Sequence, residues 1–350
     1  MSTAAPATPY LRVDVDRLRA NVTRAAEAAD AAGVALRPHA KTHKSAHVAR
    51  LQLEAGAVGL TVATVGEAEA FAAAGVTDLF VAYPLWLTAD LAGRLRALRS
   101  SGARLAIGVD SVAGARTAAE LLAGSGTEVL VEVDSGHHRS GVDPALTGDV
   151  ALAAGDLPVR GVFTFPGHSY SPGARAVAAR DEAAALSAAR TSLRTAGLDA
   201  GVVSGGSTPS LAHTDTSVLT EVRPGVYVFN DAQQWELGSA TPDQVALTAV
   251  ATVVSHAGGP AVLDAGSKVL GADRASYASG CGRLLDHPDA RIVQLSEHHA
   301  VAELPGRLPP LGSKVLVVPN HCCTAVNLAD ELWPSTGEGP WPVTARGRNG

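Results

Sequence analysis

The sequence predicts a (β/α)8 barrel of the TIM type followed by a β-rich C-terminal domain. Short apolar or β-branched runs recur along the first 235 residues, and Ala-rich segments with helical periodicity separate them. Continuous apolar strands that alternate with helices indicate a parallel sheet covered on both faces. After residue 236 helical segments nearly vanish, and strand-like runs are joined by Gly and Pro turns. We therefore expect a barrel over residues 14–235 and a β-rich domain over residues 236–350 that also includes residues 1–13.

Eight runs have the length and composition of barrel strands. They are residues 34–41, 59–64, 79–83, 104–110, 128–134, 159–165, 200–206 and 225–231. The segments between them are typical of helices. Leu18 and Val22 share one face of a helix that Asp14 or Asp16 can cap, and Thr64 and Glu67 have the spacing of a capping box. An open doubly wound sheet is the competing fold, because counting strands alone does not distinguish it from a barrel.

Composition and charge narrow the class of protein. The chain has 350 residues, 46% of them hydrophobic, and a formal net charge of −6, which argues against nucleic acid or an anionic membrane as a partner. Its longest apolar run is too short to span a bilayer, which takes about 20 residues. The N-terminus has no secretory h-region, and three cysteines form no disulfide framework. We expect a soluble cytoplasmic protein.

Polar residues follow the predicted strands at their carboxyl ends. Lys41 ends the first strand, Arg139 follows the fifth, Tyr170 follows the sixth, residues 204–210 end the seventh and Tyr227 lies in the eighth. In a (β/α)8 barrel the carboxyl ends of the strands carry the chemistry. The sequence therefore predicts that these residues share one pocket.

The run "SGGSTPS" over residues 204–210 has the composition of an anion-binding turn. Gly205 and Gly206 allow backbone geometry closed to other residues and leave room for a ligand, and Ser204, Ser207 and Thr208 add hydroxyl groups. Phosphate often binds at the loops after strands seven and eight of a barrel. An ordinary strand-to-loop turn is the alternative, and the position at strand seven favours phosphate.

Lys41 has three interpretations. It is a solvated surface lysine, a clamp for phosphate or carboxylate, or a reactive amine whose pKa is lowered by burial and by cationic neighbours such as His39 and Lys44. A lysine at a strand end together with a phosphate-binding turn suits pyridoxal phosphate, which has one aldehyde and one phosphate group. Arg139 can hold an anion or form a surface salt bridge, and Tyr170 and Tyr227 can contact the cofactor or be ordinary half-buried tyrosines.

The run "PNHCCT" follows an apolar strand of the second domain. His321 and Cys323 are two residues apart, so along an extended strand they point the same way. Imidazole and thiolate are good zinc ligands, and two protein ligands leave positions open for water or substrate. The alternative is a buried histidine beside two buried cysteines. Cys322 points the other way from Cys323, and we assign it to packing.

The motifs together resemble one family of enzymes. They are "RPHAKTHKS", "VDSGHHRSGV", "GHSY", "SGGSTPS", "RPGVYVFND" and "PNHCCT". In this order they are similar to the metal-dependent D-serine dehydratase and D-threonine aldolase group, which are alanine-racemase-like, fold-type III pyridoxal-phosphate enzymes. The resemblance extends over nearly the whole chain, and "PHAKTHK" is its most specific motif.

The resemblance assigns roles to the site residues. It implies that Lys41 carries the cofactor as an internal aldimine and that residues 204–208 bind its phosphate. It places Arg139, Tyr170 and Tyr227 near the cofactor or substrate. It implies that His321 and Cys323 bind Zn2+ or another divalent cation such as Mn2+, and that the enzyme is a homodimer.

The resemblance also implies the reaction. The expected activity is dehydration of a small D-3-hydroxyamino acid, with D-serine giving pyruvate and ammonia. The alternative is a D-threonine aldolase, which cleaves its substrate to glycine and an aldehyde. The "HxC" form of the metal pair resembles the dehydratase branch. A pyridoxal-phosphate carrier and a metallohydrolase barrel that uses His39 and His43 are more distant alternatives.

Overall fold

The computed structural model describes residues 6–350 and divides the chain into two compact units. The barrel unit contains residues 25–41, 52–225 and 348–350. Within the described residues the β-rich unit contains residues 6–24, 42–51 and 226–347. Within the described residues no helix combines the length and the apolar character needed to cross a membrane.

Eight parallel strands form the sheet of the barrel unit. They are β2 (Ala35–Leu36), β3 (Leu60–Val62), β4 (Asp78–Pro84), β5 (Arg104–Val109), β6 (Glu128–Glu132), β7 (Val159–Phe163), β8 (Val202–Gly205) and β9 (Glu221–Val222). Their order is β2-β9-β8-β7-β6-β5-β4-β3. A parallel bridge between His39 and Thr61, with the Thr61 N–H donating to Pro38 O at 2.8 Å, joins the two ends. The closed sheet confirms the predicted barrel and excludes the open doubly wound sheet.

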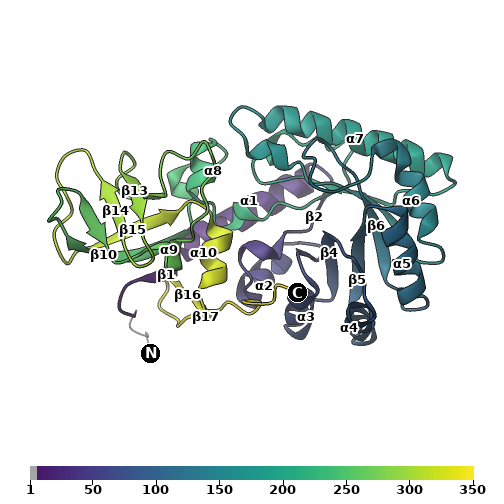
Figure 1. The fold of residues 1–350 in the computed structure, drawn as a ribbon, viewed down its shortest axis with the longest axis horizontal. Helices are drawn as coiled ribbons and strands as arrows, with labels where there is room; N and C mark the ends of the chain where they lie inside the picture. Colours follow the sequence, from purple (N-terminus) through teal and green to yellow (C-terminus); the bar gives the residue numbers. More distant parts are fainter. Residues whose placement is uncertain (1–5) are drawn as a thin grey trace. The chain divides into compact units, whose positions relative to one another are not determined.

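Helices follow the strands and cover the barrel from outside, where Figure 1 shows α4 to α7 beside β4, β5 and β6. The chain forms α1 (Val15–Ala31), α2 (Ala46–Glu54), α3 (Val65–Ala73), α4 (Ala89–Ser100), α5 (Val112–Leu122), α6 (Thr147–Ala153) and α7 (Arg175–Thr195), with 3-10 turns η1 (Ala40–Thr42), η2 (Pro144–Leu146), η3 (Gly167–Tyr170) and η4 (Leu211–His213). Asp14, one of the two candidates, caps α1, and Thr64 caps α3, whereas the Glu67 carboxylate accepts from the Ala63 N–H at 2.7 Å, so only one half of the capping box forms. Asp14 Oδ1 accepts from the Arg17 N–H at 3.2 Å, and Thr64 Oγ1 accepts from the Glu67 N–H at 3.1 Å.

The prediction for the eighth strand was wrong in position. The strand is Glu221–Val222, whereas residues 225–231 form the 3-10 turn η5 (Val226–Val228) and the N-cap of helix α8 (Ala232–Glu236). Asn230 adopts φ +54° and its N–H donates to Val226 O at 2.7 Å, so this segment is turned rather than extended. Aromatic and β-branched residues favoured a strand here, but local hydrogen bonds and the Asp231 cap decide the conformation.

Charged side chains form a network at the amino ends of the barrel strands. Arg37, 1% exposed, contacts Glu221 and Asp78 at 2.7 Å each. Arg104 contacts Asp78 at 3.6 Å and Glu128 at 2.9 Å. A Cβ at residue 59 would lie 2.4 Å from the Arg37 guanidinium, so the chain requires glycine there. Ion pairs therefore stabilise this end of the barrel, with Arg37 buried and Arg104 half exposed, opposite to the end where the chemistry of barrels lies.

Replacement of Arg37 by methionine should lower the free energy of unfolding by about 3–5 kcal/mol, because it leaves Glu221 buried without its cation. Replacement of Arg104, which is half exposed, should cost less than about 1 kcal/mol. Urea unfolding of both variants measures the difference. Equal losses for the two variants would show that the buried ion pair at Arg37 is not special.

The β-rich unit contains the second sheet. Its strands are β1 (Tyr10–Val13), β10 (Leu247–Ser255), β11 (Ala261–Leu263), β12 (Gly282–Leu284), β13 (Arg291–Leu295), β14 (Ala300–Glu303), β15 (Lys314–Pro319), β16 (Glu331–Pro334) and β17 (Trp341–Pro342). The order is β13-β14-β11-β10-β1-β16-β17, and β15 pairs with both β10 and β12. Short helical segments accompany them: η6 (Pro242–Gln244), α9 (Ser267–Leu270) and α10 (Cys322–Leu328). Because β1 pairs with β10 and β16, the N-terminal strand belongs to this sheet.

Candidate active site

Phe165, directly beyond β7, lies at the centre of the predicted site residues of the barrel unit. The Lys41 amine lies 5.6 Å from the centre of its ring, and the Arg139 guanidinium carbon lies 5.2 Å from it. The rings of Tyr170 and His137 lie 6.1 and 5.6 Å away. The structure thus brings Lys41, Arg139 and Tyr170 to one aromatic surface. Sequence reasoning missed Phe165, because an aromatic residue at a strand end is indistinguishable from a core residue.

Lys41 lies in the turn η1 rather than at the end of a long strand. Strand β2 contains only Ala35–Leu36, whereas the prediction extended it through residue 41. The side chain of Lys41 is half buried, and the ring of Phe165 forms part of its surroundings. The lysine still follows the carboxyl end of the first barrel strand, which is the end where barrels carry their chemistry.

The turn over residues 204–208 is buried and requires its two glycines. Gly206 has φ +80°, which other residues rarely adopt, and a Cβ on Gly205 would lie 2.3 Å from a carboxylate oxygen of Glu182. Ser207 Oγ contacts Ser169 Oγ at 2.8 Å, and Ser169 precedes Tyr170 in η3. The turn therefore lies against the segment that carries Tyr170. Its glycines and hydroxyl groups fit the phosphate of pyridoxal phosphate.

A buried arginine below this turn was not identified from the sequence. Arg223 donates from Nε to Ser204 Oγ at 2.8 Å and from Nη2 to Thr164 O, and its guanidinium lies 5.3 Å from the centre of the Phe163 ring. Burial lowers its pKa, while Glu221 acts in the opposite direction. The signal was present in the motif "RPGVY", in which the arginine follows strand β9. Arg223 fixes the hydroxyl of Ser204 from inside the barrel.

The loop that carries Arg139 is organised by Asp134. Its Oδ1 accepts from the N–H groups of Gly136 and His138 at 2.9 and 3.0 Å, and its Oδ2 contacts His138 Nδ1 at 2.6 Å. His138 adopts φ +56°. Beyond it, Glu132 is buried, which raises its pKa, and Ser140 donates to Glu132 Oε1 at 3.1 Å. His138 therefore stabilises the conformation of this loop through Asp134, and His137 packs against Phe165.

The expected strand geometry of His321 and Cys323 was wrong. His321 is the N-cap of α10, and Cys323 lies in the first turn of that helix. Asp231, fully buried, accepts from the Cys322 N–H at 3.1 Å and contacts His321 Nδ1 at 3.2 Å. The Cys323 sulfur lies 3.3 Å from Thr42 Oγ1. Strand alternation therefore does not set the direction of these side chains, and Asp231 orients His321 instead.

The electrostatics of this cluster come from its close negative groups. Cys323 and Asp231 raise the pKa of His321 against the opposing effect of burial. Cys322 has no exposed surface, and burial raises the pKa of its thiol, which agrees with the packing role expected for it. Among residues 6–350 no group of three or more His, Cys, Asp or Glu side chains is arranged to hold a metal ion. His321 and Cys323 offer two donors, which fits an open site with Asp231 behind the imidazole.

Replacement of Asp231 by asparagine should weaken metal binding about 10- to 100-fold, because it removes the charge that orients His321. Asparagine retains an oxygen that can accept from the Gln234 N–H, which Asp231 Oδ1 does at 2.9 Å, so the helix cap should survive. Competition with a chelator measures the affinity for Zn2+. An unchanged affinity in a folded variant would remove Asp231 from the site.

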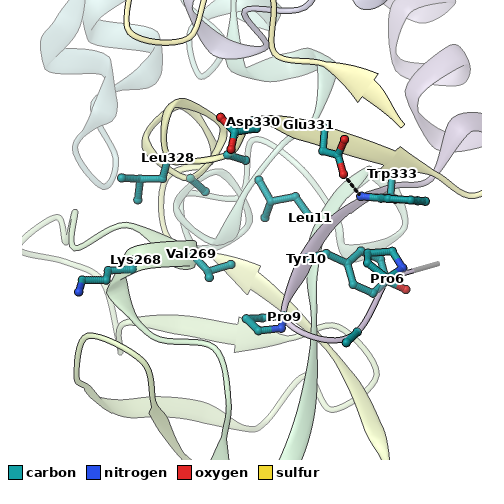
Figure 2. A pocket seen from close by; sticks show the side chains of 13 residues that line it. Pro6, Pro9, Tyr10, Leu11, Lys268, Val269, Leu328, Asp330, Glu331 and Trp333 are labelled. Carbon is teal, nitrogen blue, oxygen red and sulfur yellow. Dashed lines mark hydrogen bonds between the residues drawn. The ribbon is translucent and has the colours of Figure 1, made fainter. Parts of the chain in front are cut away.

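Tyr227 is buried in η5 of the β-rich unit, where its carbonyl accepts from Asn230 Nδ2 at 3.2 Å. The same unit has an open pocket of about 530 Å³, shown in Figure 2, between β1, β16 and the C-terminal part of α10. Tyr10 and Trp333 form one wall, with ring centres 6.2 Å apart. None of the predicted site residues lines this pocket.

Comparison with known proteins identifies the two halves of the chain. Residues 13–233 match the alanine racemase N-terminal domain, and residues 246–333 match the putative serine dehydratase domain. The chain is 38% identical over 348 residues to the D-threo-3-hydroxyaspartate dehydratase of Delftia sp. (strain HT23), covering 90% of each protein. It is 33% identical to the D-threonine aldolase of an Arthrobacter species, covering 97% of this chain and 93% of the relative. A solved structure of a D-threo-3-hydroxyaspartate dehydratase mutant in the metal-free form has a TM-score of 0.89, with 34% identity and 97% of each chain covered.

Proposed function

Because the chain belongs to the family that joins an alanine racemase N-terminal domain to a serine dehydratase domain, we propose that it is a pyridoxal-phosphate- and metal-dependent dehydratase of small D-3-hydroxyamino acids. The observation that supports this most directly is the cluster of Lys41, Arg139 and Tyr170 around Phe165. A reactive amine, a cation and an aromatic surface together suit an anionic, planar cofactor. The 38% identity to a dehydratase favours elimination of water as the reaction.

The residues that would hold the cofactor come from separate elements of the barrel unit. Lys41 would bond to its aldehyde, the turn over residues 204–208 would bind its phosphate, and Arg139 and Tyr170 would contact the ring or the substrate. Tyr227, in the β-rich unit, is a further candidate for a cofactor or substrate contact. Pyridoxal phosphate, when bound, supplies an electron sink that makes the Cα–H bond of an amino acid acidic.

The chain's own groups would then perform the proton transfers. Lys41 Nζ would accept the proton from Cα of the substrate, since a lysine amine is an effective base when uncharged. His321 and Cys323 would hold a divalent cation, Zn2+ or one such as Mn2+, which supplies Lewis acidity for the β-oxygen. Cα would lose its proton and Cβ its hydroxide, so one water leaves. With D-serine, the released enamine takes up water and gives pyruvate and ammonia.

An aldolase is the second candidate, because a D-threonine aldolase is also a relative over 97% of the chain. That reaction uses the same residues and begins with removal of the proton from the β-hydroxyl group. The Cα–Cβ bond then breaks, and the products are glycine and an aldehyde. The HxC form of the pair His321 and Cys323 resembles the dehydratase branch of the family and favours that reaction.

Product analysis distinguishes the two reactions and identifies the substrate. Purified enzyme with pyridoxal phosphate and Zn2+ is incubated with D-serine, D-threo-3-hydroxyaspartate, D-threonine and their L-forms. A dehydratase yields ammonia with pyruvate, oxaloacetate or 2-oxobutanoate. Glycine as the main product would replace the proposal by the aldolase, and the absence of turnover with all D-forms would refute both. We also expect a homodimer, which analytical ultracentrifugation tests.

A further inference from the structure

Glu182 of helix α7 lies directly below the turn over residues 204–208. Its side chain has no exposed surface, and its Oε1 accepts from the Gly206 N–H at 2.6 Å. Gly205 leaves the space that this carboxyl group occupies, because a Cβ there would lie 2.3 Å from Oε1. Its Oε2 is buried and has no hydrogen-bond partner among the residues the structure describes. A buried carboxyl group thus supports the turn with one oxygen, while its other oxygen is buried without a hydrogen-bond partner among the described residues.

Burial of Glu182 favours its neutral form over its charged form. Burial raises the pKa of Glu182 to about 7, and the Gly206 N–H and the charge of Arg223 act in the opposite direction. When it is protonated, Oε1 can still accept from Gly206, and the group carries no charge. When it is ionised, a negative charge lies below a turn whose proposed ligand is a phosphate dianion. Like charges at such a site oppose each other strongly, because little water screens them.

We propose that Glu182 is a positioning residue for phosphate: it fixes the Gly206 end of the turn in its neutral form, and its ionisation weakens the binding of a phosphoester. This inference rests on the proposed function, because the turn must be a phosphate site. Bound phosphate then favours protonated Glu182, so binding above neutral pH is accompanied by uptake of a proton. The proposal concerns binding alone and involves no step of the reaction.

The other charged groups near Glu182 determine which variant can serve as a control for Glu182→Gln. Arg223 approaches it from beyond β9. Asp181, its neighbour on α7, is half exposed and pairs with His168 Nε2 of η3 at 3.2 Å. An Asp181→Asn variant therefore removes the neighbouring ion pair with His168 but leaves the hydrogen bond between Glu182 and Gly206 intact. It is the matched control for Glu182→Gln, which keeps an oxygen that can accept from Gly206.

Calorimetry with pyridoxine 5′-phosphate tests the proposal without the aldehyde chemistry of Lys41. The Kd for apo protein is measured between pH 6.5 and 8.5, with pyridoxine, which has no phosphate, as the reference ligand. The phosphate itself is a dianion over most of this range, since its second pKa is about 6. We expect wild-type affinity to fall about tenfold from pH 6.5 to 8.5. Glu182→Gln should show little change with pH, and Asp181→Asn should behave as wild type.

The outcomes separate this inference from the proposed function. Equal pH dependence in wild type and Glu182→Gln would overturn the role of Glu182. If the phosphorylated ligand shows no preference over pyridoxine at any pH, the phosphate site of the proposed function fails instead. Should Glu182→Gln not fold, wild-type calorimetry at pH 8 in buffers of different ionisation enthalpy gives the answer. Proton uptake on binding supports the proposal, and binding without proton uptake overturns it.

Discussion

Replacement of Lys41 by alanine is expected to lower kcat by at least about 1,000-fold and to leave the protein unable to retain the cofactor covalently. The amine has two proposed tasks, bonding to the aldehyde and accepting the proton from Cα. Loss of both cannot be compensated by the neighbouring residues of η1, which are Ala40 and Thr42. The measurements are steady-state kinetics with the best D-substrate and mass spectrometry after borohydride reduction in the presence of pyridoxal phosphate.

The matched control is Lys268→Ala, which removes a lysine that is 58% exposed and pairs with Glu297 on the surface. It should leave both kcat and the borohydride-fixed adduct unchanged. Thermal unfolding of both variants separates chemistry from folding. If Lys41→Ala retains a covalent adduct and turnover within about tenfold of wild type, Lys41 is not the reactive amine, and the two other interpretations, a surface lysine and an anion clamp, remain.

Replacement of Cys323 by alanine should lower turnover by about 100-fold or more and abolish tight binding of Zn2+. Of the two proposed protein ligands, only His321 then remains. Hydroxide is a poor leaving group, so the loss of Lewis acidity should affect kcat more than KM. Chelation of the wild-type enzyme with EDTA should have the same effect and should be reversed by added Zn2+. Metal content by mass spectrometry and kcat together measure the change.

The adjacent Cys322 provides a control within the same helix. Its side chain is fully buried, and the contact with Asp231 comes from its backbone N–H, which alanine retains. Cys322→Ala should therefore lower the free energy of unfolding by about 1 kcal/mol and leave metal binding intact. If Cys322→Ala loses the metal and Cys323→Ala keeps it, the ligand assignment from the motif is reversed.

The barrel was predictable because its strands are buried on both faces. The runs 104–110 and 128–134 have apolar centres at residues 105–109 and 129–131, and each contains a strand at the expected place. Strand β9 was not predicted because it is two residues long and begins with Glu221, whose charge is compensated by Arg37 from a distant part of the chain. A sequence window contains no information on such a partner, so local composition favoured the neighbouring segment.

In the candidate site, too, residues with a local sequence signal were predicted, and residues whose roles depend on distant contacts were not. Lys41, Arg139 and Tyr170 were predicted to lie together because each follows a strand of a parallel sheet, and the structure places them around Phe165. The role of Phe165 depends on these three contacts and has no local signal. Asp231 likewise lies 90 residues before His321, and only the folded chain brings its carboxylate to the imidazole.

The ion pairs at the amino ends of the barrel strands have a consequence for heat resistance. Charged groups lose part of their favourable hydration as temperature rises, so burying Arg37 with Glu221 and Asp78 becomes less costly on warming. Apolar packing gains no comparable advantage over the same interval. The end of the barrel formed by the amino ends of its strands should therefore be among the last parts of the molecule to unfold when the protein is heated.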